Sequence, residues 1–336
     1  MATQSFLIDQ ITMRSIFVLR AAGRSARDAQ QFLPGLLNRI RRILRDEPSD
    51  RLFVIAREIE QIVLSEFTDM TESLMSDLVE FGDIETEWAS RLLVEGTLLE
   101  TVRIVPEQLL ATFTNQPMVM VRGTRLETLT PNQLLRNLAQ RKATQVGQII
   151  RDAQVLGETA RDISPRIGEV IGPVSRRDIE TDTLTLFNHY SNQAKDAAYQ
   201  ANADILDGVR IVATLDSRTS PQCRHYDGME YPLGVGPRPP FHRRCRTQAV
   251  PQVAERFRIP VPGRTRASQF GPVDAQLTYD GFLRRQSEAF QNEVLGPNRA
   301  AAFRRGLPVD RFTDNSGITL TLDQLRNMFP DKFPQQ

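Results

Sequence analysis

Both cysteines of this 336-residue chain and two of its three histidines lie in one short segment, residues 216–251. The segment reads DSRTSPQCRHYDGMEYPLGVGPRPPFHRRCRTQAVP and contains Cys223, His225, His242 and Cys245. Residue types this rare seldom gather by chance. Glycine and proline in the middle of the segment exclude a regular helix or a paired strand there. We therefore expect a compact loop knot that is held together by its cysteine and histidine side chains.

Short strands are predicted on both sides of these loops. Residues 209–216 (VRIVATLD) alternate apolar and polar side chains and include β-branched residues, which is typical of a strand. A second short strand is expected at MEYPL (229–233), and a third at RTQAVP (246–251), ending at Pro251. Turn signals separate them at Ser220-Pro221 and at Tyr226-Asp227-Gly228.

Three interpretations of the knot remain open at this stage. In the first, Cys223, His225, His242 and Cys245 bind zinc, which favours four tetrahedral nitrogen or sulfur ligands. In the second, Cys223 and Cys245 form a disulfide, which requires an oxidising environment. In the third, the cysteines are reduced and buried, and the histidines donate hydrogen bonds to backbone carbonyls. Asp216 and Arg218 are expected to order the turn that they occupy rather than to catalyse a reaction.

The rest of the chain is predominantly helical in pattern. Residues 1–45 and 51–81 carry apolar side chains at spacings of three and four, the period of an amphipathic helix. Asp83 is expected to cap a further helix that ends near Gly96. Further helices are predicted from Thr130-Pro131 to near Gly157, at 158–171 and at 175–202, the last two separated by Gly172-Pro173. The predicted fold class is mainly α with a small β element.

This pattern divides the chain into five predicted parts. They are an N-terminal helical region (1–103), a connector with short strands such as MVMVRG (104–130), a helical part (131–207), the strand and Cys-His knot (208–251), and an extended, wrapping C-terminal arm with short terminal helices (252–336).

Composition narrows the class of protein. Apolar residues make up 40% and charged residues 25% of the chain, as in ordinary globular proteins, and the net charge is +1. The basic residues are almost all arginine, which suits interfaces and contacts with DNA phosphates. No segment approaches the roughly 20 uninterrupted apolar residues of a membrane span, and the N-terminus lacks a secretory pattern. We therefore expect synthesis in the cytoplasm and no membrane contact.

Common catalytic motifs are absent from the sequence. There is no P-loop, no G-x-S-x-G elbow and no H-E-x-x-H pair. Each cysteine lies close in sequence to a histidine, Cys223 to His225 and Cys245 to His242. This arrangement favours a structural role for the cysteines over that of a thiolate nucleophile. His189 stands alone in a predicted helix, where a packing role is expected. The prediction is a protein without catalytic residues.

The segment resembles the signature of the phage Mu F-like minor head proteins, a family of head morphogenesis proteins of tailed bacteriophages. Members show D-x-R-T-x-x-x-C, a turn of the type L-D-G, and then P-P-x-H-x-x-C-R before a closing proline. The corresponding residues here are Asp216, Arg218, Thr219, Cys223, Tyr226-Asp227-Gly228, Pro239-Pro240-Phe241-His242, Cys245-Arg246 and Pro251. The downstream segments 281–306 and 310–325 are also similar, so that the resemblance covers about residues 130–328. Members often carry two more cysteines, where this chain has Ser220 and Thr247.

The resemblance implies a minor structural protein of the virion, inside the capsid at the portal vertex in several copies. Its implied partners are the portal protein, the major capsid protein and packaged DNA, and its implied roles are head assembly, DNA packaging and DNA ejection. The alternative is a zinc-dependent nucleic-acid-binding protein or nuclease acting on packaged DNA. Arginine-rich stretches such as LNRIRRILR (37–45) and FHRRCRTQ (241–248) could contact phosphates in that case.

Overall fold

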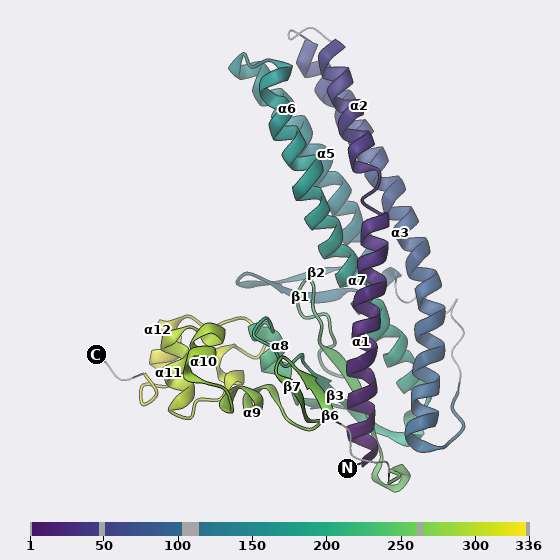
Figure 1. The fold of residues 1–336 in the computed structure, drawn as a ribbon, viewed down its shortest axis with the longest axis vertical. Helices are drawn as coiled ribbons and strands as arrows, with labels where there is room; N and C mark the ends of the chain where they lie inside the picture. The colour runs from purple at the N-terminus through teal and green to yellow at the C-terminus, as the bar shows by residue number, and fades with distance from the viewer. Residues whose placement is uncertain (1, 47–50, 103–113, 261–264, 334–336) are drawn as a thin grey trace.

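The computed structural model describes residues 2–46, 51–102, 114–260 and 265–333. Long helices form an elongated bundle, with small antiparallel sheets and a group of short C-terminal helices toward one end (Figure 1). The predicted class, mainly α with a small β element, is confirmed. The long helices are α1 (Ala2–Asp28), α2 (Leu33–Asp46), α3 (Leu52–Thr97), α5 (Pro131–Leu156), α6 (Ala160–Glu169) and α7 (Ser175–Ala201). The short ones are α8 (Pro221–Tyr226), α9 (Tyr279–Arg284), α10 (Glu288–Leu295), α11 (Pro297–Arg304) and α12 (Leu322–Met328).

Helix α3 is one continuous element of 46 residues. At 1.5 Å per residue it is about 69 Å long, and it packs along α5 and α7. The predicted start of a new helix at Asp83 is therefore wrong. The residue before it, Gly82, lies where the ring of Tyr190 on α7 approaches the α3 backbone. An aspartate can cap a helix, but here α7 packs against α3 around Asp83, and α3 continues through this position.

The N-terminal helices do not form a separate region. Helix α1 packs on α7, and its residues Phe6, Leu7 and Ile8 lie in the same apolar core as the sheet of the knot. Helix α2 shares a second core with α3, α5 and α6. The apolar faces of α1, α2 and α3 are thus largely covered by later parts of the same chain, because α5 and α7 run beside them.

Several predicted boundaries agree with the structure. Thr130 and Gln133 form a capping box at the start of α5, and Gly157 ends that helix in the left-handed conformation. The predicted strand MVMVRG is β1 (Met118–Arg122), which pairs with β2 (Arg125–Leu129). At Gly172-Pro173 the expected break is instead a short π-helical turn, Val170–Val174, that joins α6 to α7. A π-turn can accommodate a proline without ending the helical path.

The knot is built on a three-stranded antiparallel sheet in the order β4-β3-β5. The strands are β3 (Leu206–Val212), β4 (Glu230–Tyr231) and β5 (Gln248–Val253). Pro251 lies inside β5 opposite Val209, although the sequence pattern predicts that it ends the strand. Strand β5 is at the edge of this sheet, where a residue without an N–H group is tolerated.

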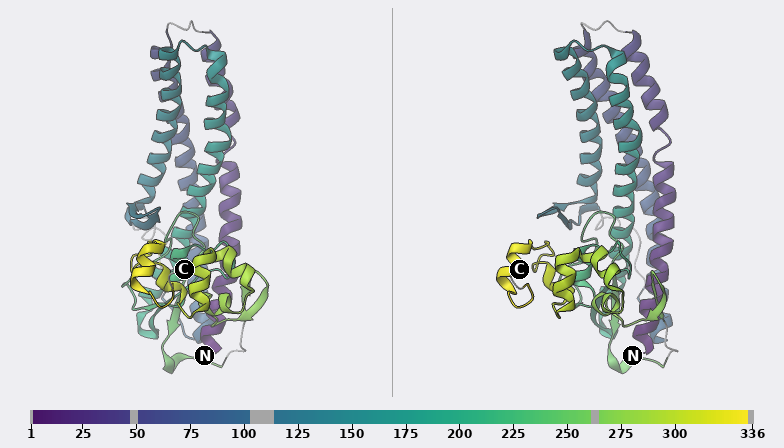
Figure 2. Two further views of the ribbon diagram at one scale, coloured as in Figure 1. Left: turned by 90° about the vertical axis from the view of Figure 1, so that its left-hand side faces the viewer. Right: turned by 60° about the vertical axis from the view of Figure 1, so that its left-hand side comes forward.

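The C-terminal part is more compact than the predicted extended arm. Strands β6 (Thr265–Ser268) and β7 (Gly271–Asp274) form a hairpin. Helices α9 to α12 then surround an apolar core of their own, rich in aromatic side chains such as Tyr279, Phe282 and Phe303. Figure 2 shows these helices gathered on one side of the lower end of the bundle. Their short amphipathic patterns are individually weak, but together they bury a core.

Candidate metal centre and the knot around it

Three of the four predicted ligands meet in the structure. Cys223 comes from α8, and His242 and Cys245 come from the loop that precedes β5. The Cys223 sulfur lies 3.1 Å from Nε2 of His242 and 3.6 Å from the Cys245 sulfur. The donor atoms of all three residues lie within 4.8 Å of one another, and both cysteines are buried. This group could hold a metal ion.

The fourth predicted ligand, His225, lies outside the group. Its Nδ1 atom is 2.9 Å from the carbonyl oxygen of Asp310. The sequence pattern predicts a turn at Ser220-Pro221, whereas the structure has the short helix α8 there, with Ser220 as its cap. Residues two apart on a helix do not face the same side, so His225 points away from Cys223. The four-ligand set is therefore corrected to a three-ligand set.

The other two interpretations of the knot can also be compared with the geometry. Both cysteines are free, and a sulfur separation of 3.6 Å is far longer than the roughly 2.05 Å of a disulfide bond. The hydrogen bonds to carbonyls that the third interpretation predicts are present for His225 and for His242, whose Nδ1 lies 2.7 Å from the oxygen of Arg243.

The contact with Arg243 fixes the orientation of the His242 ring. A carbonyl oxygen only accepts, so Nδ1 carries the proton that is donated to it. Nε2 then faces the Cys223 sulfur, and in the neutral ring this atom has a free lone pair. A metal-binding histidine is held in the same way by a hydrogen bond from its other ring nitrogen. Burial lowers the pKa of His242, but the neighbouring Cys245 outweighs burial and raises it overall, so Nε2 becomes available to a metal when the ring loses its second proton.

The two thiols titrate as a pair. Burial raises the pKa of Cys223 well above that of an ordinary thiol, and the neighbouring Cys245 raises it further. Burial also opposes ionisation of Cys245, but its contacts with Cys223 and His242 outweigh burial and hold its pKa well below the usual range. One thiolate in the pair is favoured and a second is strongly opposed, as expected for two like groups in contact.

Two hydroxyl side chains complete the surroundings of Cys223. The hydroxyls of Ser220 and Thr247 lie beside Cys223 and work against the rise in its pKa, and Ser220 also accepts the backbone N–H of Cys223 at 3.2 Å. Two hydroxyl oxygens therefore lie beside the three candidate ligands.

Asp216 orders its turn, as predicted. Its Oδ1 atom accepts hydrogen bonds from the backbone N–H of Arg218 (3.1 Å) and from the hydroxyl of Thr219 (2.9 Å). Arg246 adds two parallel contacts to the same carboxylate, of 2.6 and 2.9 Å. Burial raises the pKa of Asp216, but Arg246 and Thr219 outweigh burial and lower it overall. Arg218 donates its backbone N–H to Asp216, and the ion pair with this carboxylate is made by Arg246.

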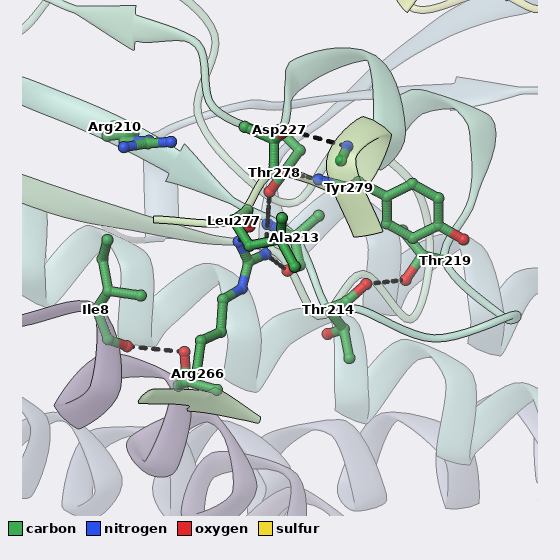
Figure 3. Close-up of polar contacts among 12 residues, drawn as sticks. Ile8, Arg210, Ala213, Thr214, Thr219, Asp227, Arg266, Leu277, Thr278 and Tyr279 are labelled. Atoms are coloured by element: carbon green, nitrogen blue, oxygen red, sulfur yellow. Dashed lines mark hydrogen bonds and ion pairs between the residues drawn. The ribbon is translucent and has the colours of Figure 1, made fainter. Parts of the chain in front are cut away.

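A second ion pair in the knot is fully buried. Asp227 and Arg266 face each other at 3.1 Å, with side-chain exposures of 1% and 3% (Figure 3). Asp227 also accepts from the backbone N–H groups of Ala213 (2.6 Å) and Tyr279 (2.5 Å). Arg266 donates to the carbonyl oxygen of Leu277 at 2.7 Å and contacts that of Ala213. The pair joins the knot, the β6–β7 hairpin and α9.

Polar contacts also connect the knot to α7. Arg243 pairs with the buried carboxylate of Asp182 at 2.6 Å, and the backbone N–H of Arg244 donates to Thr185 at 2.9 Å. Burial raises the pKa of Asp182 to about 6, although the charge of Arg243 works in the opposite direction. On the same helix, burial lowers the pKa of Lys195 to about 8, and its amine contacts Gln248 of β5.

Sequence patterns did not identify Arg266, Asp182 or Lys195 as members of this site, and they gave Arg246 only as part of a signature word, without its partner Asp216. An isolated charged residue is usually on the surface, and nothing local marks Arg266, Asp182 or Lys195 as buried. The rarity of lysine could have drawn attention to Lys195.

Comparisons with known proteins add no relative. No family model, no curated protein and no solved structure matches the chain. Among the described residues, none of the helices has the length and apolar character needed to cross a membrane.

Proposed function

We propose that the chain is a minor structural protein of a tailed-bacteriophage head, located inside the capsid near the portal vertex in several copies. In this role it contacts the portal and major capsid proteins and supports head assembly, DNA packaging or DNA ejection. One observation carries the proposal: residues of separate signature words meet in space. Asp216 from the first word pairs with Arg246 from the last, and Cys223 lies against His242 and Cys245.

A structural role agrees with how the cluster is enclosed. Cys223 and Cys245 are only 2% and 1% exposed. A thiolate nucleophile must reach a substrate, and catalytic cysteines are therefore partly exposed. The buried Asp227–Arg266 pair and the contacts with α7 hold the same loops from two further sides. The knot is best suited to holding a fixed shape.

We further propose that the metal is zinc. Two cysteines and one histidine are ligands that zinc prefers, and two thiols in contact release a proton readily when a cation is bound. A water molecule or one of the hydroxyls of Ser220 and Thr247 would supply the fourth ligand. Bound zinc would add a crosslink between α8 and the loop before β5.

Metal content tests this part of the proposal. Protein purified without chelator should contain about one zinc per chain, and a strong chelator should lower its melting temperature. Cys245→Ser should lose the metal, because it removes a sulfur ligand, whereas His225→Gln should retain it. Metal analysis and thermal melts provide both readouts. Equal melting temperatures with and without chelator, together with no bound zinc, would contradict the zinc site.

Virion location tests the structural role. Mass spectrometry of purified heads of a phage that encodes the chain should detect it at a few copies per particle. Crosslinking in those heads should connect it mainly to the portal protein and the major capsid protein. The proposal fails if full heads lack the chain.

The three-ligand geometry also favours a second candidate, a zinc-dependent nucleic-acid-binding protein or nuclease. Catalytic zinc sites keep three protein ligands and one open position. This candidate predicts salt-dependent retention on DNA that is lost with chelator and with Cys245→Ser. Retention that is insensitive to chelator would exclude it.

A further inference from the structure

A hollow lined by both polar and apolar side chains lies beside the knot and is separate from the cysteine cluster. Its volume is about 460 Å³. Its walls come from α1, from the turn that follows β3, and from the β6–β7 hairpin. The residues that matter for its chemistry are Ile16, Thr214, Ser217, Arg218, Arg246 and Gln269.

The walls of the hollow are fixed to one another. The backbone N–H of Gln269 donates to the carbonyl oxygen of Leu215 at 2.8 Å. In return, the side-chain oxygen of Gln269 accepts from the backbone N–H of Ser217 at 2.8 Å. Helix α1 packs against β6 on the other side. The hollow is therefore a preformed feature of the fold, which lowers the entropy lost when a ligand binds.

The hollow carries an excess of positive charge. Arg246 is neutralised by Asp216, the only acidic residue among those that line it. Arg218 is exposed, and within the described part of the chain its guanidinium has no carboxylate within 4.0 Å. One arginine fork is thus available to a ligand, and the adjacent Asp216–Arg246 pair fixes the backbone that carries it.

Neutral hydrogen-bond donors accompany this arginine. The side-chain amide of Gln269 and the hydroxyls of Ser217 and Thr214 line the same hollow. Hydroxyls of α1 are less suitable, since Thr12 donates to the carbonyl of Ile8 within its own helix. An arginine fork with hydroxyl and amide donors matches the oxygen atoms of a phosphate group. The apolar side chain of Ile16 offers a surface for a sugar or a base.

We propose that this hollow binds a phosphate group, supplied either by a nucleic-acid backbone or by a free nucleotide. Arg218 contacts two phosphate oxygens, and Ser217 and Gln269 donate to the others. The site does not depend on bound metal or on the location of the chain in a virion, so its test is independent of the proposed function.

Calorimetric titration of the full chain tests the site with three probes: inorganic phosphate, a 5′-mononucleotide and a single-stranded DNA 12-mer. We expect Arg218→Gln to weaken the binding of inorganic phosphate roughly tenfold, as for the loss of a charge-assisted contact. The matched control is Arg57→Gln, which removes another exposed arginine, on α3. It should leave the affinity unchanged. Melting temperatures of both variants should equal that of the parent chain.

The two larger probes identify the source of the phosphate. If DNA is the ligand, its affinity should fall with salt, and Arg218→Gln should reduce that salt dependence by about one phosphate contact. If a free nucleotide is the ligand, Arg218→Gln should weaken the binding of the mononucleotide, as it does that of inorganic phosphate, but not that of the DNA 12-mer. The proposal is overturned if Arg218→Gln binds phosphate as the parent does, or if Arg57→Gln weakens binding equally.

Discussion

At the scale of single residues, the buried pair of Asp227 and Arg266 joins the knot to the β6–β7 hairpin and to α9. Removing two charges from water costs several kcal/mol each, and here the backbone groups of Ala213, Leu277 and Tyr279 offset that penalty together with the pair itself. Breaking such a pair on one side leaves an isolated buried charge. The intact pair therefore adds little net stability, but the loss of either partner would disrupt the packing of the knot.

We predict that Asp227→Asn lowers the free energy of unfolding by about 3–5 kcal/mol, because it leaves the Arg266 charge buried and unpaired. Arg266→Met should give a similar loss, and the double variant should lose less than the sum of the two. Urea unfolding measures all three. Glu87→Gln removes one partner of an exposed pair with Arg91 and should change stability by less than about 1 kcal/mol. Strict additivity in the double variant would contradict the coupling.

The buried side chain of His189 predicts a loss of stability at acidic pH. Burial lowers its pKa from 6.5 to about 4, so the unfolded chain binds a proton at a higher pH than the folded chain. Stability contributed by the neutral ring should be complete above pH 6.5 and should fall between pH 6.5 and 4. The lowered pKa of His189 corresponds to roughly 3 kcal/mol of stability that depends on the neutral ring.

The contribution of Asp182 to stability changes with pH in the opposite direction. Burial raises its pKa from 3.8 to about 6, so the folded chain takes up that proton first and gains stability as the pH falls through this window. In His189→Gln only the Asp182 contribution should remain at α7. We expect the urea midpoint of this variant to decline less between pH 6.5 and 4 than that of the parent. An equal decline would show that the His189 ring does not titrate as its burial implies.

At the scale of whole elements, close approach between helices decides how the bundle packs. A side chain at Gly82 on α3 would place its Cβ atom 1.9 Å from the hydroxyl oxygen of Tyr190 on α7. Tyr190 is almost completely buried and tilts against Phe81, so its ring has little room to move. The absence of a side chain at Gly82 thus sets the distance between α3 and α7.

We therefore expect Gly82→Ala to destabilise the chain by about 1–3 kcal/mol, although alanine is the better helix former. The matched control is Gly23→Ala in α1, where the nearest atom outside its own helix backbone is the tip of Arg27 at 3.8 Å. This control should stabilise by up to about 1 kcal/mol through helix propensity alone. Thermal melts of the two variants should move in opposite directions. A gain in stability for Gly82→Ala would show that α7 is not held at this point.

The elements that the sequence predicts well are those with a strong local signal. The capping box at Thr130 with Pro131, the apolar spacing along α3 and the alternation in β3 all act within a few residues. The boundaries that were wrong, at Asp83 and at Pro251, depend on a neighbour that is distant in sequence. A helix or strand can continue past a residue that usually ends it when another element packs at that position. The local sequence pattern does not show where such packing occurs.

At the scale of the molecule, the first helix supports the knot across more than 200 residues of sequence. Leu7 is fully buried in the core that contains Cys223 and Cys245, and it also packs against α3 at Gly96. This explains why residues 1–103 do not form a unit of their own.

Leu7→Ala should lower the free energy of unfolding by about 2–5 kcal/mol and should also loosen the knot. The rate at which a thiol reagent labels the two cysteines under native conditions measures the second effect, and it should increase. Leu36→Ala is the control, because Leu36 is equally apolar and buried but belongs to the core shared by α2, α3, α5 and α6. Equal labelling rates in both variants would show that the two cores open together.

The sequence by itself determined that cysteine and histidine side chains meet in a loop knot, that Asp216 orders its turn, and that the chain is mainly helical. These properties follow from residue types that are rare, from local hydrogen bonds and from short apolar periods. Only the tertiary structure decided that His225 leaves the ligand group, that Arg246 and Arg266 carry the ion pairs, and that the N-terminal helices belong to the same core. Those outcomes depend on which surfaces face each other after folding, because burial and charge pairing are properties of neighbours in space.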